Sequence, residues 1–514
     1  MFLKIALLVV FFAVMLGIGI YSRNKAKNVN DYVLGGRTVG PWISAFAFGT
    51  SYFSSVVFIG YAGQFGWKFG LASTWIGLGN AFIGSLLAWL ILGRRTRLMS
   101  QQLDAKTMPE YFGKRFDSKA LRIAGSIIAF VFLVPYTAGV YNGLSRLFGM
   151  AFDIDYRICV IIMAALTAAY VVIGGYMATA LNDFIQGIIM LIGICLVIGA
   201  VLAGKGGFTE AVKSLSQVAT DPSVTTEALQ DGQGLFASFF GPDPLSLLGV
   251  VILTSLGTWG LPQMVHKFYA IKDEKAVKTG TVVSTFFAIV IAGGCYFLGG
   301  FGRLFGDQPG VVNADGSVAY DSIVPSMLST LPDILIGIVV VLVFSASMST
   351  LSSLVLTSSS TLTLDLIKPL MKKKELKDKT QLRLMQIFVV AFIAISVVLA
   401  FNPPTFIAQL MGYSWGALAG AFLAPFLYGL YSKKITKAAV WASYILGVVF
   451  TVLNMFLHFI ASPINAGAIT MIAGLIIVPI VSALTPKPDQ EKVSQMFECY
   501  EKTVTVPERE NLGK

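Results

Sequence analysis

The sequence predicts an all-α integral membrane protein, on two observations. Of its 514 residues 55% are hydrophobic and only 13% are charged, whereas about a quarter of the residues in soluble globular proteins are charged. Apolar stretches of roughly 20 residues, long enough to cross a bilayer as helices, recur along the whole chain. Backbone groups in lipid must be satisfied within the chain, so these stretches are expected to be helical. This composition excludes an ordinary cytosolic enzyme.

Thirteen membrane spans are predicted, each an apolar stretch bounded by more polar loops. They are residues 2–21, 42–62, 71–92, 123–144, 159–176, 183–202, 245–265, 281–302, 334–364, 384–401, 406–430, 438–459 and 466–484. The first stretch lacks a basic segment before it and a small-residue cleavage site after it, so we expect a retained helix and not a signal peptide.

Lysine and arginine are distributed unevenly between alternate loops. With the first loop on the cytoplasmic side, that side holds 31 of the 38 basic residues and the other side holds 7. Basic loops stay in the cytoplasm, so the N-terminus is expected outside and the C-terminus inside. The basic residues behind the net charge of +11 lie in these loops, so the charge does not indicate a nucleic-acid partner, and none is expected. The chain has no Asn-x-Ser/Thr sequon, which favours a bacterial plasma membrane.

Two of the predicted spans contain sequences that interrupt a helix. The second span carries Gly49-Thr50-Ser51 followed by Ser54-Ser55, and the seventh carries Thr254 to Pro262, which includes Gly257, Gly260 and the proline. The two interruptions lie at corresponding places in two blocks of five spans, spans 2–6 and 7–11, and an odd block length inverts the second block. Paired interrupted helices indicate a transporter's central site. The alternative is that these glycines only pack helices closely.

The ninth span contains the densest run of hydroxyl side chains in the chain. Ala346, Ser349, Thr350 and Ser353 follow helical spacing and share one face, with Ser352 beside it. Hydroxyls and unwound carbonyls are neutral oxygen ligands that suit sodium. The alternative is that these hydroxyls bond back to their own helix.

Ionisable residues are rare within the predicted spans. Asp183 lies at the cytoplasmic mouth of the sixth span and is a candidate functional carboxylate, with helix N-capping as the alternative. His266 is expected at the membrane interface and His458 near the outer face, both in structural roles. The chain has no Walker motif and no nucleophile elbow, so neither an ATP-driven pump nor any other enzyme is expected.

Several segments together resemble the sodium:solute symporter family, which includes bacterial proline, pantothenate and sialic acid symporters and animal sodium/glucose cotransporters. They are Asp31-Tyr32-Val33-Leu34-Gly35-Gly36-Arg37, Gly174-Gly175 with Asn182-Asp183 and Gln186-Gly187, Gly260-Leu261-Pro262, and Met348-Ser349-Thr350-Leu351-Ser352. The resemblance covers roughly residues 31–431. It implies an inverted five-helix repeat, the fold of amino-acid transporters of the leucine type.

The resemblance also implies site residues. The principal sodium site falls on the carbonyls of Thr50, Phe53 and Ala346 and the hydroxyls of Ser349 and Thr350. A second sodium site, present in some members, falls on Asp183, Ser349, Ser352 and Ser353. The substrate falls beside Ser54 and Tyr136, enclosed by groups near Thr254 and Trp259.

The expected function is sodium-coupled import of a small organic solute, an amino acid or a monocarboxylate such as proline or pantothenate, by alternating access. The alternatives are a sugar or sialic acid symporter of the same family, and a channel or receptor-like protein without coupled transport. The segment Ser51-Tyr52-Phe53-Ser54-Ser55-Val56 departs from the Ser-Asp-Met-Ser-Gly-Trp of proline symporters, and Gly260-Leu261-Pro262 is nearer to the pantothenate-type branch. Sodium is the coupling ion, no organic cofactor is expected, and the protein is expected to act as a monomer.

The expected organisation follows from the spans. It consists of an N-terminal extra helix (1–22), the first repeat (41–203), an extracellular loop (204–244), the second repeat (245–430), two C-terminal helices (438–484) and a cytoplasmic tail (485–514).

Overall fold

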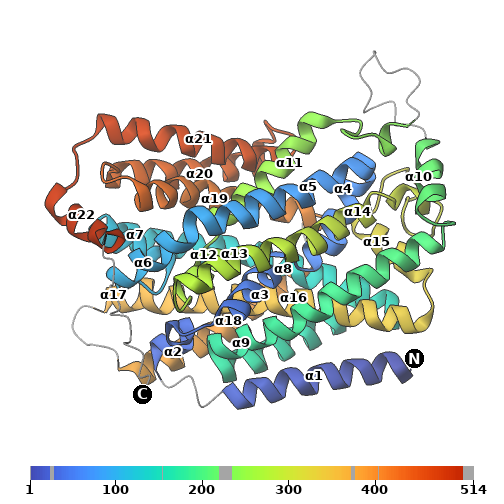
Figure 1. Cartoon of the computed structure of the whole chain (residues 1–514), viewed down its shortest axis with the longest axis horizontal. Coiled ribbons are helices and arrows are strands. Elements are labelled where there is room, and N and C mark those ends of the chain that lie inside the picture. Colours follow the sequence, from blue (N-terminus) through green and yellow to red (C-terminus); the bar gives the residue numbers. More distant parts are fainter. Residues whose placement is uncertain are drawn as a thin grey trace, which may run out of the picture.

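The computed structural model describes residues 2–22, 28–152, 154–218, 234–371, 377–402 and 405–501. In these residues the regular structure is helical, and the β-type pairs are two isolated bridges, Val39 with Ile271 and Val312 with Val318. The long helices run side by side along the molecule (Figure 1). The predicted all-helical class is confirmed.

The first half of the chain contains ten α-helices with short 3₁₀ and π segments between them. They are α1 (Phe2–Ser22), α2 (Val29–Leu34), η2 (Gly35–Arg37), α3 (Pro41–Tyr52), η3 (Val56–Tyr61), α4 (Ala62–Phe69), η4 (Gly70–Ser73), α5 (Thr74–Gly79), η5 (Asn80–Leu87), η6 (Trp89–Gly93), α6 (Arg94–Gln102), α7 (Met108–Arg115), α8 (Lys119–Phe152), α9 (Tyr156–Ala203), α10 (Phe208–Ser216) and η7 (Leu235–Ala237).

The second half contains α11 to α22. Its elements are α11 (Pro244–Leu256), η8 (Gly257–Gly260), α12 (Pro262–Tyr269), α13 (Glu274–Ala288), η9 (Ile289–Gly293), α14 (Gly294–Gly299), η10 (Gly302–Phe305), α15 (Tyr320–Ser329), α16 (Asp333–Thr361), η11 (Leu362–Ile367), α17 (Lys368–Leu370), α18 (Asp378–Phe401), α19 (Ile407–Tyr431), α20 (Lys437–Leu457), α21 (Pro463–Leu484), α22 (Gln490–Phe497) and η12 (Glu498–Tyr500).

The number of spans differs from the prediction when helices are counted as continuous units. Ten helices of the described residues are long and apolar enough to cross a membrane, or eleven if the bent pair α11 and α12 is one span. One reason is that α9 runs through 48 residues where two spans are predicted. Another is that the second predicted span is divided, because α3 ends after 12 residues.

A single residue, Gly175, interrupts the helical conformation within α9. Gly175 has φ 56° and ψ −156°, a conformation that is essentially restricted to glycine. Residues on both sides of Gly175 are helical, so Asp183 lies inside a helix and not at its start. The alternative role of Asp183 as a helix N-cap is therefore wrong.

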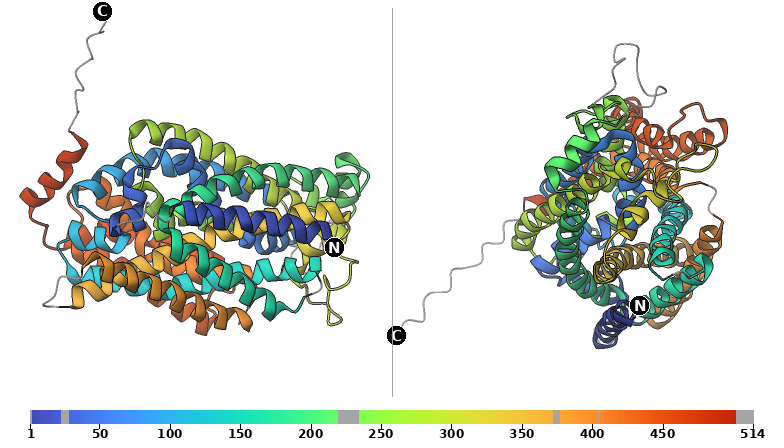
Figure 2. Two further views of the ribbon diagram at one scale, coloured as in Figure 1. Left: turned by 90° about the horizontal axis from the view of Figure 1, so that it is seen from below. Right: turned by 90° about the vertical axis from the view of Figure 1, so that its right-hand side faces the viewer.

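Helix α16 is one of the most deeply buried helices of the bundle, and α1, at the N-terminus, lies at its edge (Figure 2). In the most apolar window of each helix, 78% of the α16 residues are buried against 28% for α1. Because the hydroxyls of α16 are buried, they need hydrogen-bond partners within the protein, since an unpaired buried polar group is costly. The surrounding helices α3, α8 and α9 pack against α16.

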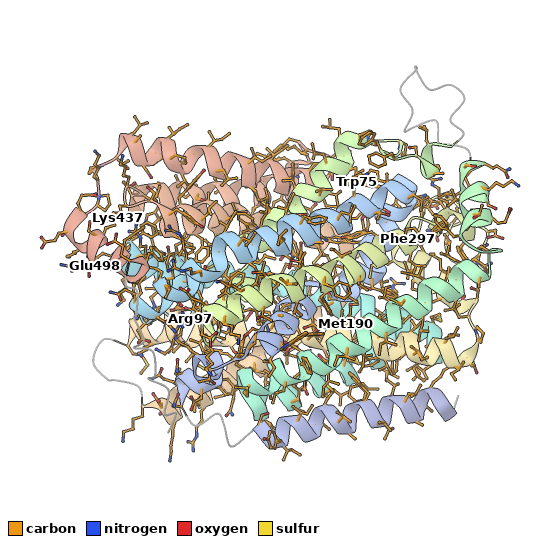
Figure 3. All side chains as sticks on the ribbon, in the orientation of Figure 1. Trp75, Arg97, Met190, Phe297, Lys437 and Glu498 are labelled. Carbon is orange, nitrogen blue, oxygen red and sulfur yellow. The ribbon has the colours of Figure 1, made fainter. Side chains whose placement is uncertain are left out.

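The two ends of the bundle differ in their side chains. The end where α1 begins carries α10 and α15, while α6, α7 and α22 lie at the opposite end (Figure 1). Of the labelled side chains, Trp75 and Phe297 lie toward the first end, and the charged Arg97, Lys437 and Glu498 lie toward the second (Figure 3).

An ion-pair network ties α7, α8 and η11 together at the second end. Arg122 lies 2.9 Å from Glu110 and 2.7 Å from Asp365, and Lys114 lies 3.2 Å from Glu110. Burial raises the pKa of Glu110, but Arg122 and Lys114 outweigh it and hold this pKa below its usual value. Glu110 therefore stays ionised and anchors the network.

Candidate functional site

The first interruption lies between α3 and η3. Gly49, Thr50 and Ser51 are helical, and the chain becomes extended at Phe53, with φ −111° and ψ 101°. The Ser54 hydroxyl then accepts a hydrogen bond from the Val56 amide at 3.1 Å and caps the next segment. Because α3 stops here, the carbonyls of its last turn lack helical N–H partners and need others.

Hydroxyls of α16 satisfy these carbonyls. Ser349 donates to the Thr50 carbonyl at 3.0 Å and lies 3.0 Å from the Ala346 carbonyl. Thr350 lies 3.2 Å from the Ser51 carbonyl, 3.4 Å from that of Thr50 and 3.3 Å from that of Ala346. We call these five oxygens, from Thr50, Ser51, Ala346, Ser349 and Thr350, the oxygen cluster.

The oxygen cluster brings together four of the five residues predicted for the principal sodium site. The fifth, Phe53, lies at the break itself, and in the described part of the chain the Ser349 and Thr350 hydroxyls of α16 donate to the carbonyls of Thr50 and Ser51 instead. The prediction did not include the Ser51 carbonyl, which accepts a hydrogen bond from Thr350, although its place beside Thr50 in an interrupted helix is a usable signal. All five oxygens are neutral and their residues are buried, so a cation here would meet dipoles and not a counter-charge.

The residues predicted for a second sodium site divide into two groups. Ser352 and Ser353 both donate to the Ser349 carbonyl, at 2.9 and 3.0 Å, and Ser353 lies 2.8 Å from the Ser51 hydroxyl. Asp183 makes a different contact, because its Oδ2 accepts a hydrogen bond from the Lys267 ammonium at 3.2 Å. Both members of this ion pair are buried, with side chains 1% and 3% exposed.

Lys267 is the main site residue that the sequence did not reveal. It was counted with the basic residues of a cytoplasmic loop, whereas the structure places it in α12 and inside the protein. His266 beside it is also buried and makes a T-shaped contact with Tyr176, so it faces the interior of the protein, and its expected depth near the membrane interface stays a prediction. The usable signal was the apolar setting, Met264-Val265-His266-Lys267-Phe268, directly after the second break.

The residues predicted to enclose the substrate are all buried, so this region is closed to solvent. Ser54, Tyr136, Thr254 and Trp259 are between 1% and 6% exposed. Thr254 donates its hydroxyl to Val250 in its own helix, at 2.8 Å, and the Trp259 indole donates to the Ile83 carbonyl at 3.0 Å. Thr254 and Trp259 therefore donate to backbone carbonyls in this structure.

Two aromatic side chains that were not predicted complete this region. The Tyr52 hydroxyl donates to the Thr254 carbonyl at 2.5 Å and so connects α3 to α11 across the two interrupted spans. Its ring stacks on Phe53 with 4.2 Å between centroids. Trp415 of α19 lies 5.8 Å from the Tyr136 ring and 6.4 Å from Tyr52. Isolated aromatic residues are frequent in membrane helices, so neither stood out in the sequence.

Comparisons with known proteins identify a family and relatives over most of the chain. The model of the sodium:solute symporter family matches residues 32–447. The chain is 30% identical over 489 residues to the osmoregulated proline transporter OpuE of Bacillus subtilis, covering 93% of this chain and 94% of that one. It is 28% identical to the sodium/proline symporter of Salmonella typhimurium, covering 85% and 84% of the two chains, and 28% identical to that of Staphylococcus aureus, covering 94% and 93%.

Solved structures show the same fold at lower identity. A substrate-bound, outward-open Na+-coupled sialic acid symporter matches with a TM-score of 0.76 and 18% identity, over 95% of this chain and 99% of that one. A nucleobase-cation-symport-1 family transporter in a closed conformation matches with a TM-score of 0.51 and 12% identity, over 91% and 97%. On the extent of the family match and the identity to OpuE, the chain belongs to the sodium:solute symporter family.

Proposed function

We propose that this protein imports a small zwitterionic or monocarboxylate solute together with sodium, and that proline or a close analogue is the first candidate. The oxygen cluster between the broken end of α3 and the centre of α16 carries the proposal, because it offers neutral oxygens to a cation inside the bundle. The names of the relatives favour a proline-like solute. The departure at Tyr52-Phe53, where proline symporters have Asp-Met, keeps other amino acids and pantothenate in the test.

In this proposal sodium binds the carbonyls of Thr50, Phe53 and Ala346 and the hydroxyls of Ser349 and Thr350. The hydroxyls, which now donate to carbonyls, would turn their lone pairs toward the ion. The solute lies beside Ser54 and Tyr136, near Thr254 and Trp259, with Tyr52 and Trp415 as further aromatic walls. Asp183, Ser349, Ser352 and Ser353 form a second cation position, whose occupant is either another sodium ion or the Lys267 ammonium.

The proposed architecture has thirteen spans, with α9 counted as two spans and α3, η3 and α4 as one. The first inverted repeat runs from α3 to α9 and the second from α11 to α19. The N-terminus lies outside, the C-terminus lies in the cytoplasm, and the monomer is the transporting unit in a bacterial plasma membrane. The interruptions at Phe53 and Leu261 support the repeat, since each is the extended residue between two helical segments.

The membrane potential and the sodium gradient limit how far such a transporter can concentrate its solute. One positive charge crossing about 100 mV contributes about 2.3 kcal/mol, and a roughly tenfold sodium gradient contributes about 1.4 kcal/mol. Together they support a several-hundredfold accumulation of a zwitterion with one sodium ion. A monocarboxylate with one sodium ion is electroneutral, so its uptake would ignore the membrane potential.

Proteoliposomes with an imposed sodium gradient and a potassium-valinomycin potential test the proposal. Uptake of labelled proline, pantothenate, other amino acids, a sugar and sialic acid is measured in sodium, potassium and choline. We expect one small zwitterion or monocarboxylate to accumulate only in sodium. Equal uptake in all three salts would reject coupling and favour the channel alternative.

A further inference from the structure

The buried ion pair of Lys267 and Asp183 lies where the second interrupted span meets α9. Lys267 is in the last turn of α12, the short helix that follows the break at Leu261. The carbonyl end of a helix favours a cation, and the Lys267 ammonium also lies 5.3 Å from the centre of the Tyr176 ring. Asp183 is held in the interior of α9. Each charge thus has its partner within the protein.

Charge balance decides whether a second sodium ion fits beside Asp183. The carboxylate is one negative charge, and the ammonium at 3.2 Å already neutralises it. A sodium ion added at the same place would lie beside the Lys267 ammonium, and two like charges so close together in a region with almost no solvent contact repel each other strongly. Ser352 and Ser353, predicted for the same site, donate to the Ser349 carbonyl instead and carry no negative charge.

We propose that the Lys267 ammonium permanently takes the place of a second sodium ion at Asp183, so that this symporter couples one sodium ion to each solute. The inference rests on the proposed sodium-coupled function and adds its stoichiometry. Sodium binds at the oxygen cluster, which has no ammonium among its contacts in the described chain. The protein-borne cation at Asp183 moves with α12 and never dissociates, so accumulation of a zwitterion is limited to several hundredfold and not to the square of that value.

The simplest alternative is that the ion pair only fastens α12 to α9. The two roles differ in what happens when the ammonium is removed and the carboxylate is kept. If Lys267 stands in for sodium, Lys267→Met leaves the Asp183 carboxylate free to bind a second ion. If the pair is only a fastening, the variant gains no sodium.

Sodium itself is the probe, so the solute need not be known. Equilibrium binding of radioactive sodium to the purified full-length protein in detergent counts the ions per chain, and a thermal melt checks folding. We expect one sodium in the wild type, two in Lys267→Met, and one in Lys267→Arg, which keeps the cation. Lys267→Met combined with Asp183→Asn should return to one, because the new site loses its carboxylate.

Each outcome has a meaning. Two sodium ions in the wild type, or one in a folded Lys267→Met variant, would overturn the inference while leaving symport intact. No bound sodium in the wild type would instead remove the proposed function. If Lys267→Met does not fold, Thr350→Val in the wild-type background decides: the inference requires the single ion to bind at least tenfold more weakly, and unchanged binding would place that ion at Asp183.

Discussion

The two interrupted spans are joined to the rest of the bundle by different kinds of contact, neutral hydrogen bonds at the first and a charged pair at the second. At the first break, the end of α3 offers the Thr50 and Ser51 carbonyls to hydroxyls of α16, and every group involved is neutral. At the second break, α12 brings the Lys267 ammonium to the Asp183 carboxylate, and both groups are charged. A neutral cluster can accept and release a cation from solution, whereas an ion pair already carries its own cation.

The local causes of the two breaks differ as well. The first is a single extended residue, Phe53, followed by the Ser54 side-chain cap. The second is Leu261, with φ −84° and ψ 121°, and Pro262 after it lacks an N–H and disfavours a helical conformation in the residue before it. Both breaks leave carbonyls without helical N–H partners, and at the second this is partly because Pro262 has no N–H to donate to the preceding turn.

The largest expected effect concerns the charged pair. Asp183→Ala leaves the Lys267 ammonium buried without a counter-charge, which should lower the free energy of unfolding by about 3–5 kcal/mol. Adding Lys267→Met to Asp183→Ala should recover most of the loss, because no lone charge remains. Thermal unfolding of the purified variants in detergent measures both. Equal damage in the single and double variants would mean that packing, and not charge, holds this region.

The next effect concerns the packing of the second break. A Cβ at Gly260 would lie 2.8 Å from Ala419 Cα and from the Leu423 amide nitrogen of α19, and backbone atoms cannot rotate away. Gly260→Ala should therefore cost about 1–3 kcal/mol of stability. Gly199→Ala is the matched control, because a Cβ there meets nothing within 4 Å. If both variants melt like the wild type, η8 is not packed against α19 as the structure has it.

The third effect separates ion binding from stability at the first break. Thr350→Val keeps the shape of the side chain but removes its hydroxyl, so the sodium concentration for half-maximal transport should rise at least tenfold, about 1.4 kcal/mol. Ser347→Ala is the control, since the Ser347 hydroxyl donates to Val343 of its own helix at 2.7 Å. An unchanged sodium dependence in Thr350→Val would move the ion away from the oxygen cluster.

The comparison also explains how far the sequence could lead. Helical spacing is local information, so Ser349 and Thr350 could be placed on one face, and the glycines and proline marked both interrupted spans. The pairing of Lys267 with Asp183 joins residues 84 positions apart, and hydropathy assigned that lysine to a loop. Gly175 falls at the end of the fifth predicted span, 159–176, whereas in the structure it is a one-residue break with helix on both sides, a difference that hydropathy does not detect.

The smallest expected effect concerns the hydrogen bond from Tyr52 in the first interrupted span to Thr254 in the second. The Tyr52 hydroxyl donates to the Thr254 carbonyl at 2.5 Å, so Tyr52→Phe should cost about 0.5–1.5 kcal/mol, the usual net value of such a bond. Because the Tyr52 ring still stacks on Phe53, the ring should stay in place and only the hydrogen bond should be lost.

If the two breaks move as a unit during transport, Tyr52→Phe should lower the maximal rate of transport more than it lowers the sodium affinity. Tyr136→Phe serves for comparison, since this ring packs on Trp415 from α8 and not from α3. If Tyr52→Phe instead lowers the sodium affinity and leaves the maximal rate unchanged, the hydrogen bond to the second interrupted span helps to shape the oxygen cluster. The two breaks would then not act independently.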